Sequence, residues 1–219
     1  MRLYGIVGAG GFGRQVMPVA TGMLEASLSP LDFEIVFVVE HGDTDPVNGY
    51  RVISDDEFLA STDEKHFNVA IADSHARERI ADKFKAGGAL PFSITATDNV
   101  CMDNNEIDEG AIFSPFTTVT SNTKIGKFFH ANIYAYVEHD CQIGDYVTFA
   151  PNVHCNGRIV IEDHVYIGAG AMIKDGKPGQ PLVIGRDAVV GMGAVVTKNV
   201  QPSTTVIGNP ARPMKITSD

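Results

Sequence analysis

The sequence predicts an α/β, Rossmann-like half-domain over residues 1–97, followed over residues 98–219 by a parallel β-helix with a C-terminal cap. Two observations predict this organisation. A strand–glycine turn–helix pattern opens the chain, and an unbroken six-residue repeat runs from about Cys101 to Val200. The first pattern is typical of parallel sheets covered by helices. The second is typical of solenoid proteins.

The repeat places a small or apolar residue at every sixth position. These positions are Cys101, Ile107, Phe113, Val119, Ile125, Ala131, Val137, Ile143, Phe149, Cys155, Ile161, Ile167 and Ile173. The register resumes at Ile184, Val190 and Val196. A period of six matches neither an α-helix nor an ordinary strand. It indicates a parallel β-helix in which three units form one coil of about 18 residues. The alternative, a chance run of β-sandwich strands, is disfavoured by the length of the repeat.

Two segments leave the repeat. Residues Asp175–Pro181 interrupt the register and are rich in glycine and proline, so we expect a loop that projects from one corner of a coil. Residues Val206–Pro213 depart from the period at the end of the repeat. Because the open end of a solenoid requires a cap, we expect them to cover the last coil.

The N-terminal region alternates strand and helix signals. Expected strands are Leu3–Val7, Glu34–Val39, Phe67–Ala72 and Phe92–Ala96, and expected helices begin near Arg14, at the capping box Ser54–Glu57 and near His75. The turn Gly8–Gly13 has the G-x-G-x-x-G pattern that lets a phosphate approach the backbone. A dinucleotide site normally needs two such halves. An NAD-dependent dehydrogenase is therefore a disfavoured interpretation, whereas one such half-domain can bind a single nucleotide.

Composition excludes several classes of partner. The net charge of −10 argues against nucleic acid and anionic membranes. No apolar run reaches the length of about 18 residues that a membrane span requires. The chain enters a strand directly after Met1, so no signal peptide is visible, and three cysteines suggest reduced packing residues. We expect a cytoplasmic protein.

The coil length of about 18 residues predicts which side chains share a column. His139 lies at a corner and has Gly157 as its neighbour along the column, while Asp140 shares a column with Asn122 and Arg158. A histidine with an adjacent carboxylate and an open glycine beside it is an arrangement suited to general base catalysis. The alternative for His139 is a solvated corner histidine.

Other potentially reactive side chains in the repeat are expected to be structural. His130, His154 and His164 do not have the spacing of metal ligands, so no metal is expected. Cys141 occupies an inward position, which makes a thiol nucleophile an unfavourable interpretation.

The whole chain resembles the sialic-acid/bacillosamine-type sugar O- and N-acyltransferases. The resemblance rests on Gly8–Gly13, on Asn132–Gly144 and on Gly208–Ala211, and it extends nearly from end to end. It implies that the β-helix is left-handed. It also implies that acetyl-CoA supplies an acetyl group to the amino group of a UDP- or dTDP-linked 4-amino-dideoxy-sugar in bacterial surface glycan or glycoprotein synthesis.

The resemblance also implies roles for individual residues. His139 would be the general base and Asp140 its support, with acetyl-CoA bound between adjacent subunits of a homotrimer. Acetyl-CoA would contact Asn132, Thr148 and the backbone of Gly157. The nucleotide-sugar would be held by Gly8, Gly10, Gly11, Phe12, Gly13 and Glu40. Thr148 stands where many members carry a second histidine, and Glu40-His41 replaces the usual Asp-Asp or Asp-Asn, which leaves the nucleotide open.

Three alternative functions remain. The first is O-acetylation of a sugar such as sialic acid, which differs only in the nucleophile. The second is a non-catalytic β-helix scaffold, in which His139 and Asp140 would be dispensable. The third, a nucleotidyltransferase, is disfavoured because it needs a much longer N-terminal domain and a basic glycine-rich loop, and the sequence has neither.

Overall fold

The computed structural model describes residues 1–40 and 44–214. The chain divides into two compact units, one from Met1 to Thr97 and one that begins at Asp98. Among the described residues, no helix is both long enough and apolar enough to cross a membrane.

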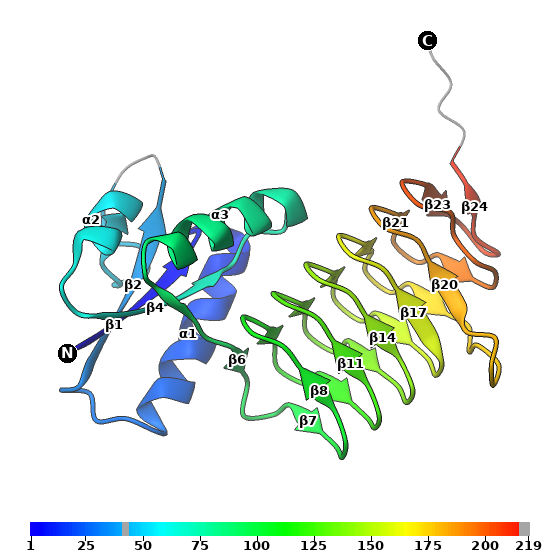
Figure 1. Cartoon of the computed structure of the whole chain (residues 1–219), viewed down its shortest axis with the longest axis horizontal. Helices are drawn as coiled ribbons and strands as arrows, with labels where there is room; N and C mark the ends of the chain where they lie inside the picture. The colour runs from blue at the N-terminus through cyan, green and yellow to red at the C-terminus, as the bar shows by residue number, and fades with distance from the viewer. Residues whose placement is uncertain (41–43, 215–219) are drawn as a thin grey trace, which may run out of the picture. The chain divides into compact units, whose positions relative to one another are not determined.

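The first unit is a parallel sheet with the strand order β3-β2-β1-β4-β5 (Figure 1). Its strands are β1 (Arg2–Val7), β2 (Phe33–Val39), β3 (Val52–Ser54), β4 (Glu64–Val69) and β5 (Leu90–Pro91), and its helices are α1 (Gly11–Glu25), α2 (Asp55–Ala60) and α3 (Ser74–Ala86). The order reverses between β1 and β4, and ligands of open α/β sheets bind at such a point, beyond the carboxyl ends of the strands. The glycine turn after β1 lies at that edge.

Side chains cap two of these helices as their sequences predict. The Ser54 hydroxyl accepts a hydrogen bond from the Glu57 amide at 3.1 Å and begins α2. The Asp73 carboxylate accepts one from the Ala76 amide at 2.8 Å and begins α3. Both contacts satisfy amides of the first helical turn that have no partner within the helix.

The strand boundaries differ from the predicted ones after β2. β4 ends at Val69 rather than Ala72, because it pairs with β1 residue by residue and β1 ends at Val7. β3 was not predicted, and β5 takes the place expected for Phe92–Ala96. Within that segment, Ile94–Thr95 forms the separate strand β6.

The second unit is a parallel β-helix with three faces, each a ladder of short strands (Figure 1). The first face contains β7 (Val100–Cys101), β10 (Thr118–Val119), β13 (Tyr136–Val137), β16 (His154–Cys155), β19 (Met172–Ile173) and β22 (Val195–Val196). The second contains β8 (Glu106–Ile107), β11 (Lys124–Ile125), β14 (Gln142–Ile143), β17 (Ile159–Ile161) and β20 (Leu182–Ile184). The third contains β9 (Ile112–Phe113), β12 (His130–Ala131), β15 (Thr148–Phe149), β18 (Tyr166–Ile167), β21 (Val189–Val190), β23 (Thr205–Ile207) and β24 (Arg212–Pro213).

The pairing register confirms the predicted coil length. Val119 pairs with Val137, and Val137 with Cys155, so each partner lies 18 residues further along the chain. Ile161 pairs with Ile184 instead, which shows that one coil contains five additional residues. The predicted inward positions from Phe113 to Val196 form one buried core. Cys101 and Ile107, in the first coil, are exposed.

The five additional residues are in the loop Asp175–Pro181, as predicted. The loop lies between β19 and β20, at the corner that joins the first face to the second, which we call corner A. Lys177 and Gln180 exchange two backbone hydrogen bonds of 2.9 Å and close the loop into a tight turn.

The C-terminal segment forms a hairpin over the last coil. β24 pairs with β23 in antiparallel orientation, the only such pair among the named strands of the described residues. The Ala211 amide donates to the Val195 carbonyl at 2.8 Å, and Ala211 packs against the β-helix core. The hairpin therefore supplies apolar contact to the end of the solenoid.

Candidate active site

His139 and Asp140 lie at corner A, in the turn between β13 and β14. Asp140 adopts a left-handed backbone conformation with φ of 60°, and the equivalent residues one coil away, Asn122 and Arg158, both have φ of 59°. Aspartate and asparagine tolerate this conformation better than most side chains. The tight corner therefore turns these three side chains outward in one column.

The His139 ring and the Asp140 carboxylate form a hydrogen-bonded pair. Nδ1 of His139 is 2.8 Å from Oδ2 of Asp140, and each side chain is 43% exposed. An ionised carboxylate only accepts hydrogen bonds, so Nδ1 carries the proton in this contact. The neutral ring then presents the lone pair of Nε2 outward, which is the state that a general base requires.

Arg158 and Asn122 support Asp140, although no role was predicted for either residue from the sequence. Nη2 of Arg158 lies 3.6 Å from the same Oδ2 atom, and Asn122 stands one coil away on the opposite side. The pKa of the Asp140 carboxyl is lowered, chiefly by the hydrogen bond from His139 and further by the charges of His139 and Arg158 and by a hydrogen bond from Asn122. The carboxyl therefore remains ionised at neutral pH. The spacing of 18 residues, which places Asn122, Asp140 and Arg158 in one column, was the sequence feature that indicated these contacts.

Gly157 provides the floor beneath the His139 ring. A Cβ atom at position 157 would lie 2.6 Å from Cε1, 2.8 Å from Nε2 and 3.1 Å from Nδ1 of His139. These distances are shorter than van der Waals contact. Any side chain at position 157 would therefore displace the ring.

The backbone of Gly157 is already hydrogen-bonded within the chain. Its amide donates to Oδ1 of Asp175 at 3.0 Å, and its carbonyl accepts from the Gly176 amide at 2.9 Å. A backbone contact to the pantetheine arm of acetyl-CoA, as the family resemblance implies, would use only the second lone pair of that carbonyl. The role of Gly157 that the geometry supports is to leave room for the His139 ring.

The other predicted acetyl-CoA contacts lie elsewhere on the prism. Asn132 is in the corner between the third and first faces, and its side-chain amide donates to the Phe149 carbonyl at 2.9 Å. Thr148 is in β15 on the third face and is only 4% exposed. One chain therefore does not bring Asn132 and Thr148 to the corner that carries His139.

The glycine turn of the first unit leaves an open helix N-terminus. Gly8 has φ of 106°, and a Cβ atom on Gly13 would lie 1.8 Å from the Gly8 carbonyl oxygen, so both positions require glycine. Gly10 and Gly11 have open space where a Cβ would be. Gly10 is the N-cap of α1, without a side-chain capping bond, and no acidic residue occupies the first turn. These are the features of a phosphate-binding turn.

Two predicted residues of this unit remain, one within that turn and one directly after the second strand. Phe12 is within the first turn of α1 and is partly buried, and Glu40 is exposed directly after β2. A carboxylate at the end of the second strand is suited to a ribose hydroxyl. His41 lies outside the described residues.

The two buried cysteines are unsuited to nucleophilic catalysis. Cys141 and Cys155 are free and buried in the prism, and the Cys141 thiol donates to the Asn156 carbonyl at 3.1 Å. Burial raises the pKa of the Cys155 thiol well above its usual value. The arrangement supports a direct transfer rather than a covalent enzyme intermediate.

Comparison with known proteins agrees with these features. Residues 5–84 match the family model described as the PglD N-terminal domain. The chain is 51% identical over 216 residues to a GDP-perosamine N-acetyltransferase of Escherichia coli O157:H7, covering 98% of this chain and 97% of the relative. The chain belongs to the nucleotide-sugar N-acetyltransferases. This confirms the family that the sequence motifs indicated.

Solved structures of relatives confirm the fold. WeeI from Acinetobacter baumannii AYE is 49% identical and superposes with a TM-score of 0.93, covering 98% of this chain and 100% of that chain. PerB from Caulobacter crescentus, solved with CoA and GDP-perosamine, is 25% identical with a TM-score of 0.82, and 97% of each chain is covered. The second unit of this N-acetyltransferase is thus a left-handed β-helix, as predicted.

The family fixes the reaction class. The protein transfers an acetyl group from acetyl-CoA to the amino group of a nucleotide-linked amino-sugar. The amine attacks the thioester carbonyl and must lose a proton, and the thiolate of CoA leaves and must gain one. A neutral imidazole at the reacting centre can carry out both transfers.

The contact between Gly157 and His139 generates the first prediction. Replacing Gly157 with Ala should lower kcat by about 100-fold, because a displacement of about 1 Å at a catalytic group has that scale of effect. The same substitution in a His139→Ala background should have little further effect. Steady-state kinetics of the single and double variants measure this coupling, and additive losses would show that Gly157 acts independently of the ring.

Proposed function

We propose that the acceptor is a GDP-linked 4-amino-sugar, GDP-perosamine or a close analogue, and that His139 is the general base of its N-acetylation. The observation that carries the proposal is the 51% identity to a GDP-perosamine N-acetyltransferase over nearly the whole chain. The His139–Asp140 pair at corner A supports the assignment of the base.

The proposal corrects the expected nucleotide. The family resemblance led us to expect UDP or dTDP, whereas the similar E. coli enzyme and the PerB complex both concern GDP-perosamine. The glycine turn and Glu40 are suited to phosphate and to a pentose hydroxyl, and GDP, UDP and dTDP all carry a diphosphate and a pentose 3′-hydroxyl. The motifs therefore could not separate them.

In the proposed mechanism, Nε2 of His139 removes a proton as the neutral amine attacks the thioester carbonyl carbon. The tetrahedral intermediate collapses, the carbon–sulfur bond breaks, and the imidazolium returns the proton to the CoA sulfur. Asp140 holds the ring through Nδ1 and stabilises its charged form. No covalent acetyl-enzyme forms.

We also propose that three copies assemble through the first face. The outward side chains of its strands include no carboxylate, lysine or arginine, and Val100 and Met172 on it are 49% and 45% exposed. By contrast, the second face presents Glu106 and Lys124 to solvent. Exposed apolar faces of this kind are typical of protein interfaces.

Corner A, with His139, bounds one edge of the first face, and the corner with Asn132 bounds the other. Packing of copies on this face would therefore place His139 at an interface, where a neighbouring Asn132 can complete the acetyl-CoA site. Asn132 is the better supported of the two predicted contacts, because Thr148 is buried on the third face. The free thiols of Cys101, Cys141 and Cys155 are consistent with the cytoplasm as the site of the reaction.

Replacement of the base tests the mechanism. His139→Ala should lower kcat by about two to four orders of magnitude, the usual contribution of a general base. Asp140→Asn should cost less, because the imidazole remains and only its orientation and charge support are weakened. Steady-state kinetics measure both effects, with circular dichroism and CoA-binding calorimetry as controls. Near-normal turnover by folded His139→Ala would remove His139 from the mechanism.

A panel of acceptors tests the nucleotide. We expect kcat/KM to be higher for GDP-perosamine than for UDP- or dTDP-linked 4-amino-sugars. Gly10→Val should raise the KM for the nucleotide-sugar far more than that for acetyl-CoA, because it fills the open space at the helix N-terminus. A preference for UDP or dTDP would refute the proposed acceptor, and an effect confined to acetyl-CoA would refute the role of the turn.

The assembly has its own test. Met172→Glu places a charge on the exposed apolar face and should give a monomer with little activity, since a buried unpaired charge is costly. Lys124→Glu on the second face is the matched control and should remain trimeric. Multi-angle light scattering reports the mass, and a wild-type enzyme that is active as a monomer would contradict the proposal.

A further inference from the structure

Three side chains on the inner side of corner A donate hydrogen bonds to backbone carbonyls. They stand 18 residues apart in one column, and each reaches the carbonyl that lies 15 residues further along the chain. The bonds run from Asn105 to Thr120 at 2.7 Å, from Thr123 to Glu138 at 3.2 Å and from Cys141 to Asn156 at 3.1 Å. We call Asn105, Thr123 and Cys141 the inner donors.

The three accepting carbonyls are left out of the backbone ladder between coils. Thr120, Glu138 and Asn156 each follow directly after a strand of the first face. Among the described residues, no backbone amide donates to any of these three oxygens. Because Thr123 and Cys141 are fully buried, their bonds form on the inside of the prism. A backbone carbonyl that lacks a partner there is unfavourable, so the inner donors supply the bond that the ladder omits.

The hydroxyl hydrogen of Thr123 goes to the Glu138 carbonyl. A second oxygen, the Ser121 carbonyl, lies 3.5 Å from the hydroxyl and already accepts the Asp140 amide at 3.1 Å. A threonine hydroxyl has one hydrogen to donate, and the Glu138 carbonyl is the closer acceptor at 3.2 Å. The hydroxyl therefore binds the residue directly before His139.

Thr123 thus anchors the peptide group that leads into His139. The Glu138 carbonyl and the His139 amide belong to one rigid plane. Within the described part of the chain, that peptide group makes no other hydrogen bond. The peptide group after His139 is held by both neighbouring coils, through the Arg158 amide at 2.9 Å and the Ser121 carbonyl at 3.1 Å. The direction of the His139 side chain depends on both planes, and Thr123 fixes the one that the ladder does not hold.

Cys141 anchors Gly157 in the same way. Its thiol donates to the Asn156 carbonyl, which belongs to the peptide group that leads into Gly157. The His139 carbonyl is a more distant acceptor for this thiol, at 3.7 Å. Gly157 is the floor against which the His139 ring lies. The two buried inner donors therefore hold the backbone on both sides of the contact between the ring and its floor.

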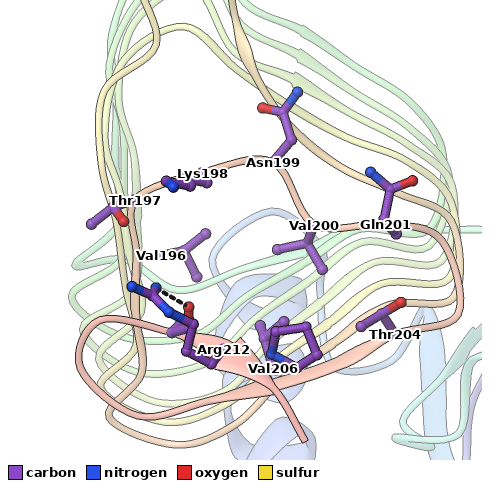
Figure 2. A pocket seen from close by; sticks show the side chains of 11 residues that line it. Val196, Thr197, Lys198, Asn199, Val200, Gln201, Thr204, Val206 and Arg212 are labelled. Carbon is purple, nitrogen blue, oxygen red and sulfur yellow. Dashed lines mark hydrogen bonds between the residues drawn. The ribbon is translucent and has the colours of Figure 1, made fainter.

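A coil can close without an inner donor. Ile159 follows Cys141 in the column and Leu182 pairs with Ile159 in the next coil, and neither side chain can donate a hydrogen bond. In the last coil, the buried Val196 and Val200 line the pocket at the open end of the β-helix (Figure 2). Apolar side chains thus close the later coils, so the fold alone does not require the hydroxyl of Thr123.

We propose that Thr123 and Cys141 are positioning residues for the acetyl transfer, Thr123 for His139 and Cys141 for Gly157. The inference rests on the proposed function, in which His139 is the general base. Without the Thr123 hydroxyl, the Glu138 carbonyl turns toward water, and the same peptide plane carries the Cα atom of His139 with it. The His139 side chain is 43% exposed and follows the backbone, because the core does not hold it.

Steady-state kinetics of the full chain test the proposal. Thr123→Val removes the hydroxyl at nearly constant volume. It should lower kcat about tenfold, because a displacement of about 1 Å at a catalytic group costs about 100-fold and this displacement is smaller. Both KM values should stay close to those of the wild type, since Thr123 does not face the substrates. Thr123→Ser keeps the hydroxyl and should restore most of kcat.

Thr117→Val is the matched control. Thr117 is another interior threonine, 1% exposed, and its hydroxyl donates to the Ser114 carbonyl at 2.8 Å, at the corner between the third and first faces. The variant should lose thermal stability, as Thr123→Val does, but keep the kcat of the wild type. Equal losses of kcat in the two valine variants, or no rescue by serine, would show that Thr123 serves only the stability of the fold.

A double-variant cycle separates this inference from the function on which it rests. In a His139→Ala background, Thr123→Val should have little further effect on kcat. Additive losses would overturn the positioning role and leave His139 as the base. Full activity of folded His139→Ala would overturn both.

The second inner donor keeps the test available if Thr123→Val does not fold. Cys141→Ala removes the donor and should lower kcat, whereas Cys141→Ser supplies a hydroxyl, a better donor than a thiol, and should not. Unchanged kcat in folded Cys141→Ala, or equal losses in the two variants, would contradict the proposal.

Discussion

The parallel hydrogen bonding between successive coils is the constraint on which the whole candidate site depends. It holds residues 18 apart in one column, so that Asn122, Asp140 and Arg158 lie side by side and Gly157 lies beneath His139. None of these outward side chains is fixed by packing in the core. Their positions follow from the backbone that carries them, and the buried apolar columns hold that backbone in place.

The site is half exposed before substrates bind. At 43% exposure, the His139–Asp140 pair is in contact with water, and solvent screening limits the interaction of Asp140 with Arg158. Ligands or a neighbouring copy that cover corner A would exclude that water and strengthen the same contacts. The residues in the column of Asp140 therefore orient its carboxylate before substrates bind. The strength of the electrostatic interactions of that carboxylate depends on whether ligands or a neighbouring copy cover corner A.

Spacing alone predicted the coils, the loop at Asp175 and the position of His139, because a repeat of fixed length determines which residues are neighbours. Spacing does not determine where a side chain points. The contact of the His139 ring with Gly157 and the bond from the Gly157 amide to Asp175 depend on rotamers and were not predictable. The short strand β3 was also missed, because three residues carry too little pattern. The nucleobase of the nucleotide-sugar could not be predicted either, because a turn that binds phosphate carries no sequence feature that depends on the base.

The antiparallel strand β24 affects how readily another chain can pair with the end of the β-helix. The exposed edge of a parallel ladder is a template on which another chain can add, and a stack of identical coils offers such an edge at its end. Here the third face finishes with a two-residue strand that reverses direction and includes Pro213, which has no amide hydrogen to donate. The hairpin thus ends the third face with a strand that is poorly suited to extension by another chain.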